Sequence, residues 1–111
     1  MPFYARQAAS AALAAIAALA GSHALAQANM EEGKKLFTQT AVPACAVCHT
    51  LEHAGAQGAI GPNLDELKPD ASRVEKAVRN GIGQMPAFKG LTDQQVATLA
   101  KYVAASAGAA K

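Results

Sequence analysis

The first periodic pattern of apolar residues lies in residues 29–40, where Met30, Gly33 and Phe37 recur at the spacing of one helix face. Asn29 is a suitable N-cap for this helix, and acidic residues in its first turn match the helix dipole. A glycine inside a helix costs roughly 1 kcal/mol relative to alanine, so we interpret Gly33 as a point where another segment of backbone comes close. The pattern predicts an N-terminal helix that packs through the side carrying Gly33 and Phe37.

A second, shorter pattern covers residues 70–80. Asp70 and Ser72 are both suitable N-caps, an apolar stripe follows one side, and Gly81 stands where a helix would end. The other side carries a basic row that consists of Arg73, Lys76 and Arg79. Such a row is typical of a solvated helix face and is less often a docking surface. We therefore predict a short amphipathic helix here, with one further turn of helix over residues 65–68.

The last helix has the clearest local signal. Thr92 and Gln95 have the spacing of a capping box, and an apolar stripe that includes Leu99 follows them. Tyr102 lies at the border of this stripe, and we expect it to meet the N-terminal helix. Residues 104–111 are rich in alanine, and we expect them to fray.

The segments between these helices are rich in glycine and proline. Residues 41–44 contain Pro43 and should end the N-terminal helix. Residues 54–62 hold three glycines, so we predict a surface loop there. Residues 81–86 are too irregular for a helix or a strand.

The first 26 residues have the composition of a cleavable secretory signal peptide. Arg6 supplies a positive charge, residues 8–20 form an alanine- and leucine-rich run, and residues 24–26 have the small-x-small pattern of a cleavage site. The alternative is an uncleaved membrane anchor, but the run is shorter than the roughly 20 residues that span a bilayer. We therefore expect an exported protein whose mature domain covers residues 27–111, with no stable membrane insertion after cleavage.

Composition limits the remaining possibilities. With 111 residues the chain is one domain at most, and its 10 basic and 8 acidic residues give no indication of a nucleic-acid partner. Much of the 51% hydrophobic content is alanine near the N-terminus, which adds little to a core. A mature chain of this size usually needs a staple or a cofactor to complete its core.

Both cysteines lie in the segment Cys45-Ala46-Val47-Cys48-His49. This spacing is the attachment pattern of a c-type haem, in which two thiols form thioethers to the porphyrin and the following histidine reaches the iron. Three other interpretations remain open: a pair of buried structural cysteines, a thioredoxin-like dithiol and a zinc site. The dithiol would need a βαβ context, and zinc would need a fourth ligand, for which His53 is the obvious candidate. Haem attachment follows export, which indicates the bacterial periplasm as the location.

Two later segments could complete a haem site. Met85, in the irregular segment before Pro86, carries a neutral thioether suited to haem iron, and with His49 it would form the pair found in electron-transfer haems. A carbonyl near Pro62 could accept a hydrogen bond from the second nitrogen of His49. The alternatives are a packed methionine and an ordinary Gly-Pro turn. Met30, on a helix face, is a weaker candidate ligand, and His53 is tethered to the same side of the ring as His49.

Taken together, these residues resemble a small class I cytochrome c of bacterial type over residues 27–105. The resemblance implies an all-α fold of three to five short helices around one covalently bound haem, with the N- and C-terminal helices crossing. The matching segments are Gly33 and Phe37, Cys45-Ala46-Val47-Cys48-His49, Gly61-Pro62-Asn63-Leu64, Met85-Pro86 and Tyr102. The same segments occur in soluble single-haem cytochromes and in cytochrome subunits of periplasmic dehydrogenases, including sulfite-oxidising ones.

The resemblance also assigns roles to single residues. It implies that Cys45 and Cys48 attach the single haem c, that His49 and Met85 are the axial ligands, that the Pro62 carbonyl accepts a hydrogen bond from His49, and that Leu64 packs against the porphyrin. No tryptophan is present for the propionate contact that some relatives make.

The function expected from these features is one-electron transfer between periplasmic redox proteins, such as a dehydrogenase or an oxidase, with no catalysis on a substrate. The alternative is an open-site haem protein that senses a gas or acts like a peroxidase, and it requires Met85 to be absent from the iron or easily displaced.

Overall fold

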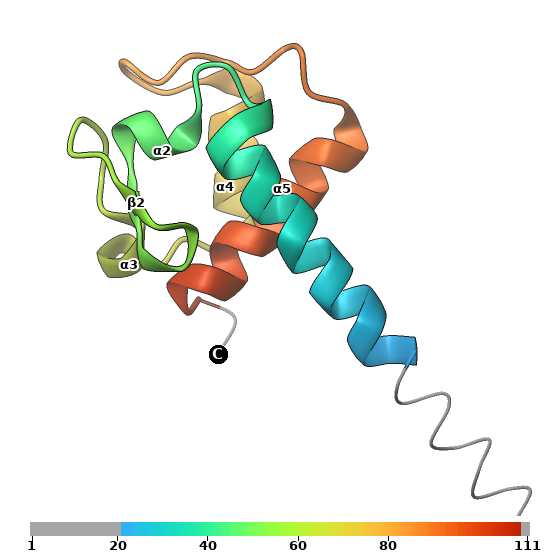
Figure 1. Cartoon of the computed structure of the whole chain (residues 1–111). Coiled ribbons are helices and arrows are strands. Elements are labelled where there is room, and N and C mark those ends of the chain that lie inside the picture. The colour runs from blue at the N-terminus through green and yellow to red at the C-terminus, as the bar shows by residue number, and fades with distance from the viewer. Residues whose placement is uncertain (1–20, 110–111) are drawn as a thin grey trace, which may run out of the picture.

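The computed structural model of the chain describes residues 21–109, and it is built mainly from helices (Figure 1). An α-helix over residues 21–35 is followed by η1 (Leu36–Thr40, π-helical), α2 (Cys45–Cys48), β1 (Thr50–Leu51), η2 (Glu52–Ala54, 3-10), β2 (Ala56–Gln57), α3 (Leu64–Leu67), α4 (Ala71–Asn80) and α5 (Asp93–Ala107). The predicted all-α architecture is confirmed. In the part of the chain that is described, no helix is both long and apolar enough to cross a membrane.

The N-terminal helix begins upstream of Asn29, so the predicted cap at that residue is wrong. The residues before it are rich in alanine, the best helix former, and they continue the helix from residue 21. Residues 21–29 are all exposed, whereas Leu36 and Phe37 are at most 1% exposed. The helix ends as predicted before Pro43. Residues 1–20, which hold most of the predicted signal peptide, lie outside the described residues.

The N-terminal helix crosses α5 near Gly33, as predicted (Figure 1). A Cβ atom built on Gly33 would overlap the side chain of Tyr102, so only a glycine lets the two helices come this close. One turn later, the ring of Phe37 meets the ring of Tyr102 edge to face, with centroids 6.3 Å apart. This crossing closes one side of the fold.

The start of α5 matches the prediction and its end does not. Thr92 and Gln95 form the capping box, with the Gln95 N–H donating to Thr92 Oγ1 and the Thr92 N–H donating to Gln95 Oε1. The expected fraying from residue 104 is wrong, because Ala104 and Ala107 are each only 5% exposed. These alanines pack against the rest of the protein, and composition alone could not show that they are buried.

The helices α4 and α3 both pack against α5. Asp70 is the N-cap of α4, since its carboxylate accepts a hydrogen bond from the Arg73 N–H at 2.8 Å. Gly81 ends the helix with a positive φ of 73°. The predicted turn over residues 65–68 is α3, capped by the side chain of Asn63.

A small hairpin replaces part of the predicted surface loop. The strands β1 and β2 pair antiparallel, with Thr50 opposite Gln57, and Gly55 makes the turn with a positive φ of 65°. Two-residue strands are too short for an alternating pattern to be visible in the sequence. The hairpin carries His53, whose Nδ1 lies 2.9 Å from Tyr102 Oη.

Candidate cofactor site

A cavity of about 780 Å³ lies between α2, the segment before α3, α4, the segment after α4 and α5. Its volume is within the roughly 300–1,000 Å³ that is usual for ligand sites, and most of its lining side chains are apolar. All six residues that the sequence assigned to a cofactor line this one cavity: Cys45, Cys48, His49, Pro62, Leu64 and Met85. Residues up to 40 positions apart in the chain are thus brought to one space.

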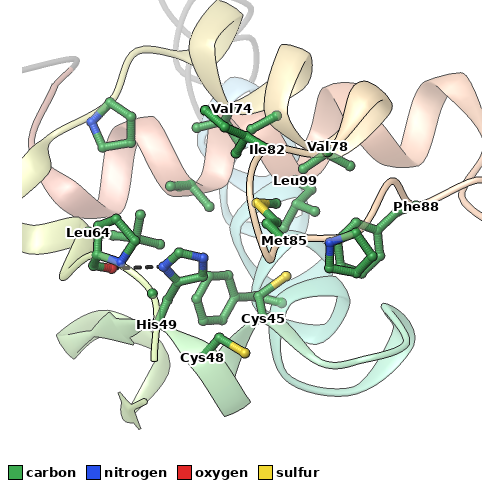
Figure 2. Close-up of a pocket in the computed structure, with 18 of the residues that line it drawn as sticks. Cys45, Cys48, His49, Leu64, Val74, Val78, Ile82, Met85, Phe88 and Leu99 are labelled. Carbon is green, nitrogen blue, oxygen red and sulfur yellow. Dashed lines mark hydrogen bonds between the residues drawn. The ribbon is translucent and has the colours of Figure 1, made fainter. Parts of the chain in front are cut away.

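His49 follows α2 in an extended conformation, and its ring faces the cavity (Figure 2). Its Nδ1 lies 2.8 Å from the carbonyl oxygen of Pro62. A carbonyl oxygen can only accept, so Nδ1 carries the proton and donates it, which leaves Nε2 with a free lone pair. This is the tautomer that a metal-binding imidazole requires.

The glycine before Pro62 makes room for this imidazole. A Cβ atom on Gly61 would lie 2.6 Å from His49 Cε1 and 2.9 Å from Nδ1, which is well inside van der Waals contact. The Gly61 N–H also donates to the carbonyl oxygen of Cys48 at 2.6 Å. The segment 61–62 therefore lies against the His49 ring and holds the orientation of the imidazole.

The two thiols of α2 lie at the edge of the cavity. Cys45 and Cys48 are both free and half-buried. Burial, together with the neighbouring Cys48, raises the pKa of the Cys45 thiol to about 11. Cys45 is therefore a neutral thiol at physiological pH.

Met85 reaches the same cavity from the segment after α4 (Figure 2). That segment is held by a pair of backbone hydrogen bonds between Ile82 and Met85, of 3.0 and 2.9 Å. A third bond, from the Phe88 N–H to the Val78 carbonyl oxygen at 2.8 Å, ties it back to α4. The methionine is thus placed by a hydrogen-bonded turn, which the sequence showed only as an irregular stretch.

The walls of the cavity include residues that the sequence did not assign to it. Val74 and Ala77 lie on the apolar side of α4, and they are half-buried because they face the cavity. Two residues of the basic row, Arg73 and Lys76, also line it. A stripe has the same pattern whether it faces a core or a cavity, so only the tertiary arrangement distinguishes the two.

The donor groups fit a haem better than a bare metal ion. An imidazole with a free Nε2 and a thioether sulfur both face a wide apolar space, with two thiols at its edge. Among residues 21–109, no three His, Cys, Asp or Glu side chains are grouped as a metal ion would need. His53, the fourth ligand that a zinc site would have required, lies against Tyr102 and does not line the cavity.

Comparison with known proteins supports this interpretation. A family model described as cytochrome C oxidase, cbb3-type, subunit III matches residues 28–103. Cytochrome c6 from Cyanidium caldarium is 32% identical over an alignment of 94 positions, and the alignment covers 77% of this chain and 78% of that protein. Cytochrome c6 from Cyanidioschyzon merolae is 33% identical over an alignment of 88 positions, and the alignment covers 72% of this chain and 77% of that protein.

A solved structure extends the likeness to the fold. The crystal structure of the c-type cytochrome SorU from Sinorhizobium meliloti matches with a TM-score of 0.72 and 51% sequence identity, covering 74% of this chain and 94% of that one. The chain belongs to the class I c-type cytochromes and is an electron carrier with covalently bound haem c.

Proposed function

We propose that this chain is a periplasmic single-haem electron carrier in which Cys45 and Cys48 would hold the porphyrin and His49 and Met85 would ligate its iron. The observation that carries the proposal is the convergence of these four side chains on one apolar cavity. When bound, haem c supplies one-electron chemistry, because its iron alternates between the ferric and ferrous states. The chain's own residues hold that group, orient it and exclude water from it.

The role of His49 follows from its hydrogen bond to Pro62. A bond of 2.8 Å to a carbonyl that only accepts keeps the proton on Nδ1 and directs Nε2 into the cavity. The hydrogen bond also raises the basicity of the imidazole, which strengthens it as a ligand. Because Gly61 packs on the ring, His49 keeps this orientation whether the protein gains or loses an electron.

The role of Met85 follows from the turn that carries it. Hydrogen bonds to Ile82 on both sides of the turn hold the Met85 backbone, so its thioether can stay in one place in both redox states. A neutral sulfur ligand stabilises the reduced state more than a charged one would, and this raises the reduction potential. The same pair of ligands in both states limits the rearrangement that accompanies each transfer.

The walls of the cavity keep water away from the metal. Leu64, Val78 and Phe88 are each at most 9% exposed and line the cavity. Two lining residues, Ile60 and Ile82, are in contrast 70% exposed. Exposed apolar side chains at a cavity entrance are suited to contact with another protein. They support transfer to a periplasmic redox partner, such as a dehydrogenase or an oxidase.

The proposal includes cleavage of residues 1–26 on export. In support, the family match begins at residue 28, and residues 21–26 are all exposed. The mature domain would then be residues 27–111.

An absorption spectrum tests the ligand assignment. The protein is produced with its leader in a bacterium that matures c-type cytochromes, and the N-terminus is determined by mass spectrometry. We expect a covalent, low-spin haem with an iron–sulfur charge-transfer band in the oxidised state and no binding of carbon monoxide in the reduced state. Met85→Ala should lose the band and bind carbon monoxide. Met30→Ala, at a methionine outside the cavity, should behave like the wild type. Carbon monoxide binding by the wild type would instead indicate an open-site sensor or peroxidase-like protein.

A further inference from the structure

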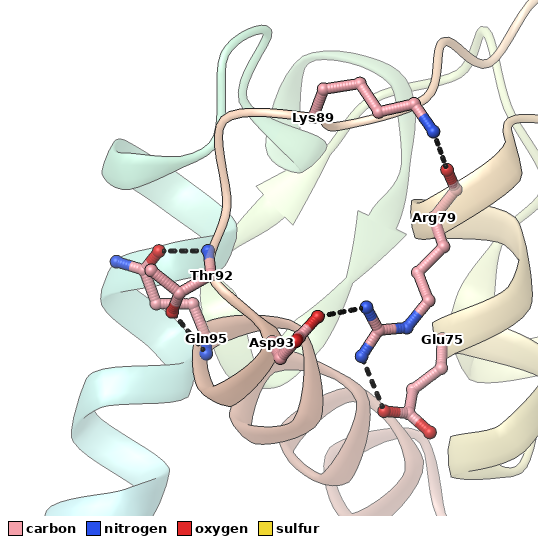
Figure 3. A network of polar contacts seen from close by, with 6 residues as sticks. All are labelled: Glu75, Arg79, Lys89, Thr92, Asp93 and Gln95. Carbon is pink, nitrogen blue, oxygen red and sulfur yellow. Dashed lines mark hydrogen bonds and ion pairs between the residues drawn. The ribbon is translucent and has the colours of Figure 1, made fainter.

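The basic row of α4 divides into two groups in the folded chain. Arg79 is engaged: it bonds to Asp93 at 2.7 Å and lies 3.7 Å from Glu75, and its carbonyl accepts a hydrogen bond from Lys89 (Figure 3). Arg73 and Lys76 form no ion pair within residues 21–109, and both line the cavity. Two free cations thus stand at the edge of an apolar cavity.

No opposite charge within residues 21–109 balances these two cations at the cavity. The titratable side chains that line the cavity, among the described residues, are Cys45, Cys48, His49, Arg73 and Lys76, and none of these is a carboxylate. An apolar cavity with two cations at one edge is complementary to a flat apolar molecule that carries two anionic groups at one edge.

The location of these cations agrees with the chemistry of haem. Figure 2 shows Val74 of α4 on the side of the cavity away from Cys48. The vinyl groups of haem, which react with the thiols, and its two propionates lie on opposite edges of the porphyrin. Attachment at α2 would therefore direct the propionates toward α4. A carboxylate at the edge of an apolar cavity is costly without a partner, and a charge-assisted hydrogen bond removes that cost.

We infer that Arg73 and Lys76 are the propionate-binding residues of this cytochrome, each neutralising one carboxylate. The inference rests on the proposed attachment of haem through Cys45 and Cys48. It gives the basic row of α4 two separate tasks, with Arg79 joining α4 to the start of α5 and the other two cations facing the cofactor. It also assigns a contact for which this chain has no tryptophan.

The test is the midpoint potential of haem-loaded Arg73→Gln and Lys76→Gln proteins, measured after the absorption spectrum has confirmed unchanged attachment and ligation. Loss of a cation leaves a propionate charge uncompensated, which favours the oxidised state. We expect each variant to shift the redox equilibrium toward the oxidised form roughly threefold to tenfold, a fall of about 28 to 59 mV at 59 mV per tenfold change. A neighbouring cation lowers the pKa of a propionic acid, so removing the cation should raise that pKa. The pH range over which the midpoint potential changes should therefore lie higher in the variants than in the wild type.

Two sets of controls separate this role from a general charge effect. Lys101→Gln removes one positive charge from an exposed site on α5 outside the cavity, and it should leave the potential unchanged. Arg73→Lys and Lys76→Arg keep the charge and should retain a potential close to that of the wild type. Equal shifts in Lys101→Gln, or charge-conserving variants that shift as much as the glutamine variants, would overturn the inference.

The outcomes also distinguish the two proposals. A wild-type protein without covalent haem would end the proposed function. A haem-loaded protein whose potential and pH dependence ignore both Arg73 and Lys76 would overturn only the inference about the propionates.

Discussion

Replacing Gly33 by alanine tests the close crossing of the terminal helices. A Cβ atom at this position would lie 2.6 Å from Tyr102 Cγ and 3.1 Å from Cδ2, whereas ordinary contacts are 3.4–4 Å. Tyr102 is only 1% exposed, and the overlap extends to its Cβ, next to the backbone, so a rotation of the ring cannot relieve it. The helices would have to separate.

Two opposing contributions decide the size of the effect. Alanine is better than glycine in a helix by about 1 kcal/mol, which alone would stabilise the variant. Overpacking in a tight interface costs about 1–3 kcal/mol, and the short distances here place Gly33→Ala at the upper end. We expect a net loss of about 1–2 kcal/mol in the free energy of unfolding, and a fall in Tm of about 4–8 °C for each kcal/mol.

Guanidinium unfolding of the haem-loaded protein, followed by circular dichroism, measures this loss. Gly90→Ala is the matched control, because a Cβ at Gly90 meets nothing within 4 Å, and its stability should change by less than about 0.5 kcal/mol. If Gly33→Ala is as stable as the wild type or more stable, the helices are not held at the distance that the structure gives, and the reasoning fails.

Two further predictions concern His49 and Tyr102. Gly61→Ala should displace the imidazole of His49, because the new Cβ would lie 2.6 Å from its Cε1 and weaken the hydrogen bond to Pro62. We expect an altered absorption spectrum and midpoint potential in this variant and no change in Gly90→Ala. Wild-type values in Gly61→Ala would contradict the prediction. Burial raises the pKa of the Tyr102 phenol above its ordinary value of 10.0. The folded state then holds this proton more tightly than the unfolded state, so the stabilisation is complete below pH 10 and is lost as pH rises through the folded-state pKa. Unfolding titrations should show a steeper alkaline loss of stability in the wild type than in Tyr102→Phe, and equal slopes would refute it.

Sequence patterns agree with the structure where they depend on neighbouring residues. The capping box of Thr92 and Gln95 is an example, because its hydrogen bonds join residues three positions apart. The break at Pro43 and the helix end at Gly81 also follow from backbone preferences of single residues. The cap predicted at Asn29 failed because a good cap does not stop a helix when alanine-rich chain precedes it.

The sequence also indicates candidate ligands, since Cys45, Cys48 and His49 have the spacing of a haem attachment site, although a dithiol and a zinc site remained open at that stage. The sequence could not show the hairpin, whose strands are two residues long, or the buried packing of Ala104 and Ala107. The strands are too short to show an alternating pattern, and the burial of the two alanines depends on what the fold places against α5.

The sequence by itself determined the start of α5 at its capping box, the end of α4 at Gly81 and the grouping of Cys45, Cys48 and His49, because those features depend on local backbone preferences and on residue type. The tertiary structure alone decided what each helix face meets. Within one basic row on α4, Arg79 pairs with Asp93 while Arg73 and Lys76 face the cavity. Arg79 has Glu75 four residues before it on the same helix, but only the fold adds Asp93 to Arg79 and places the other two cations at an apolar cavity.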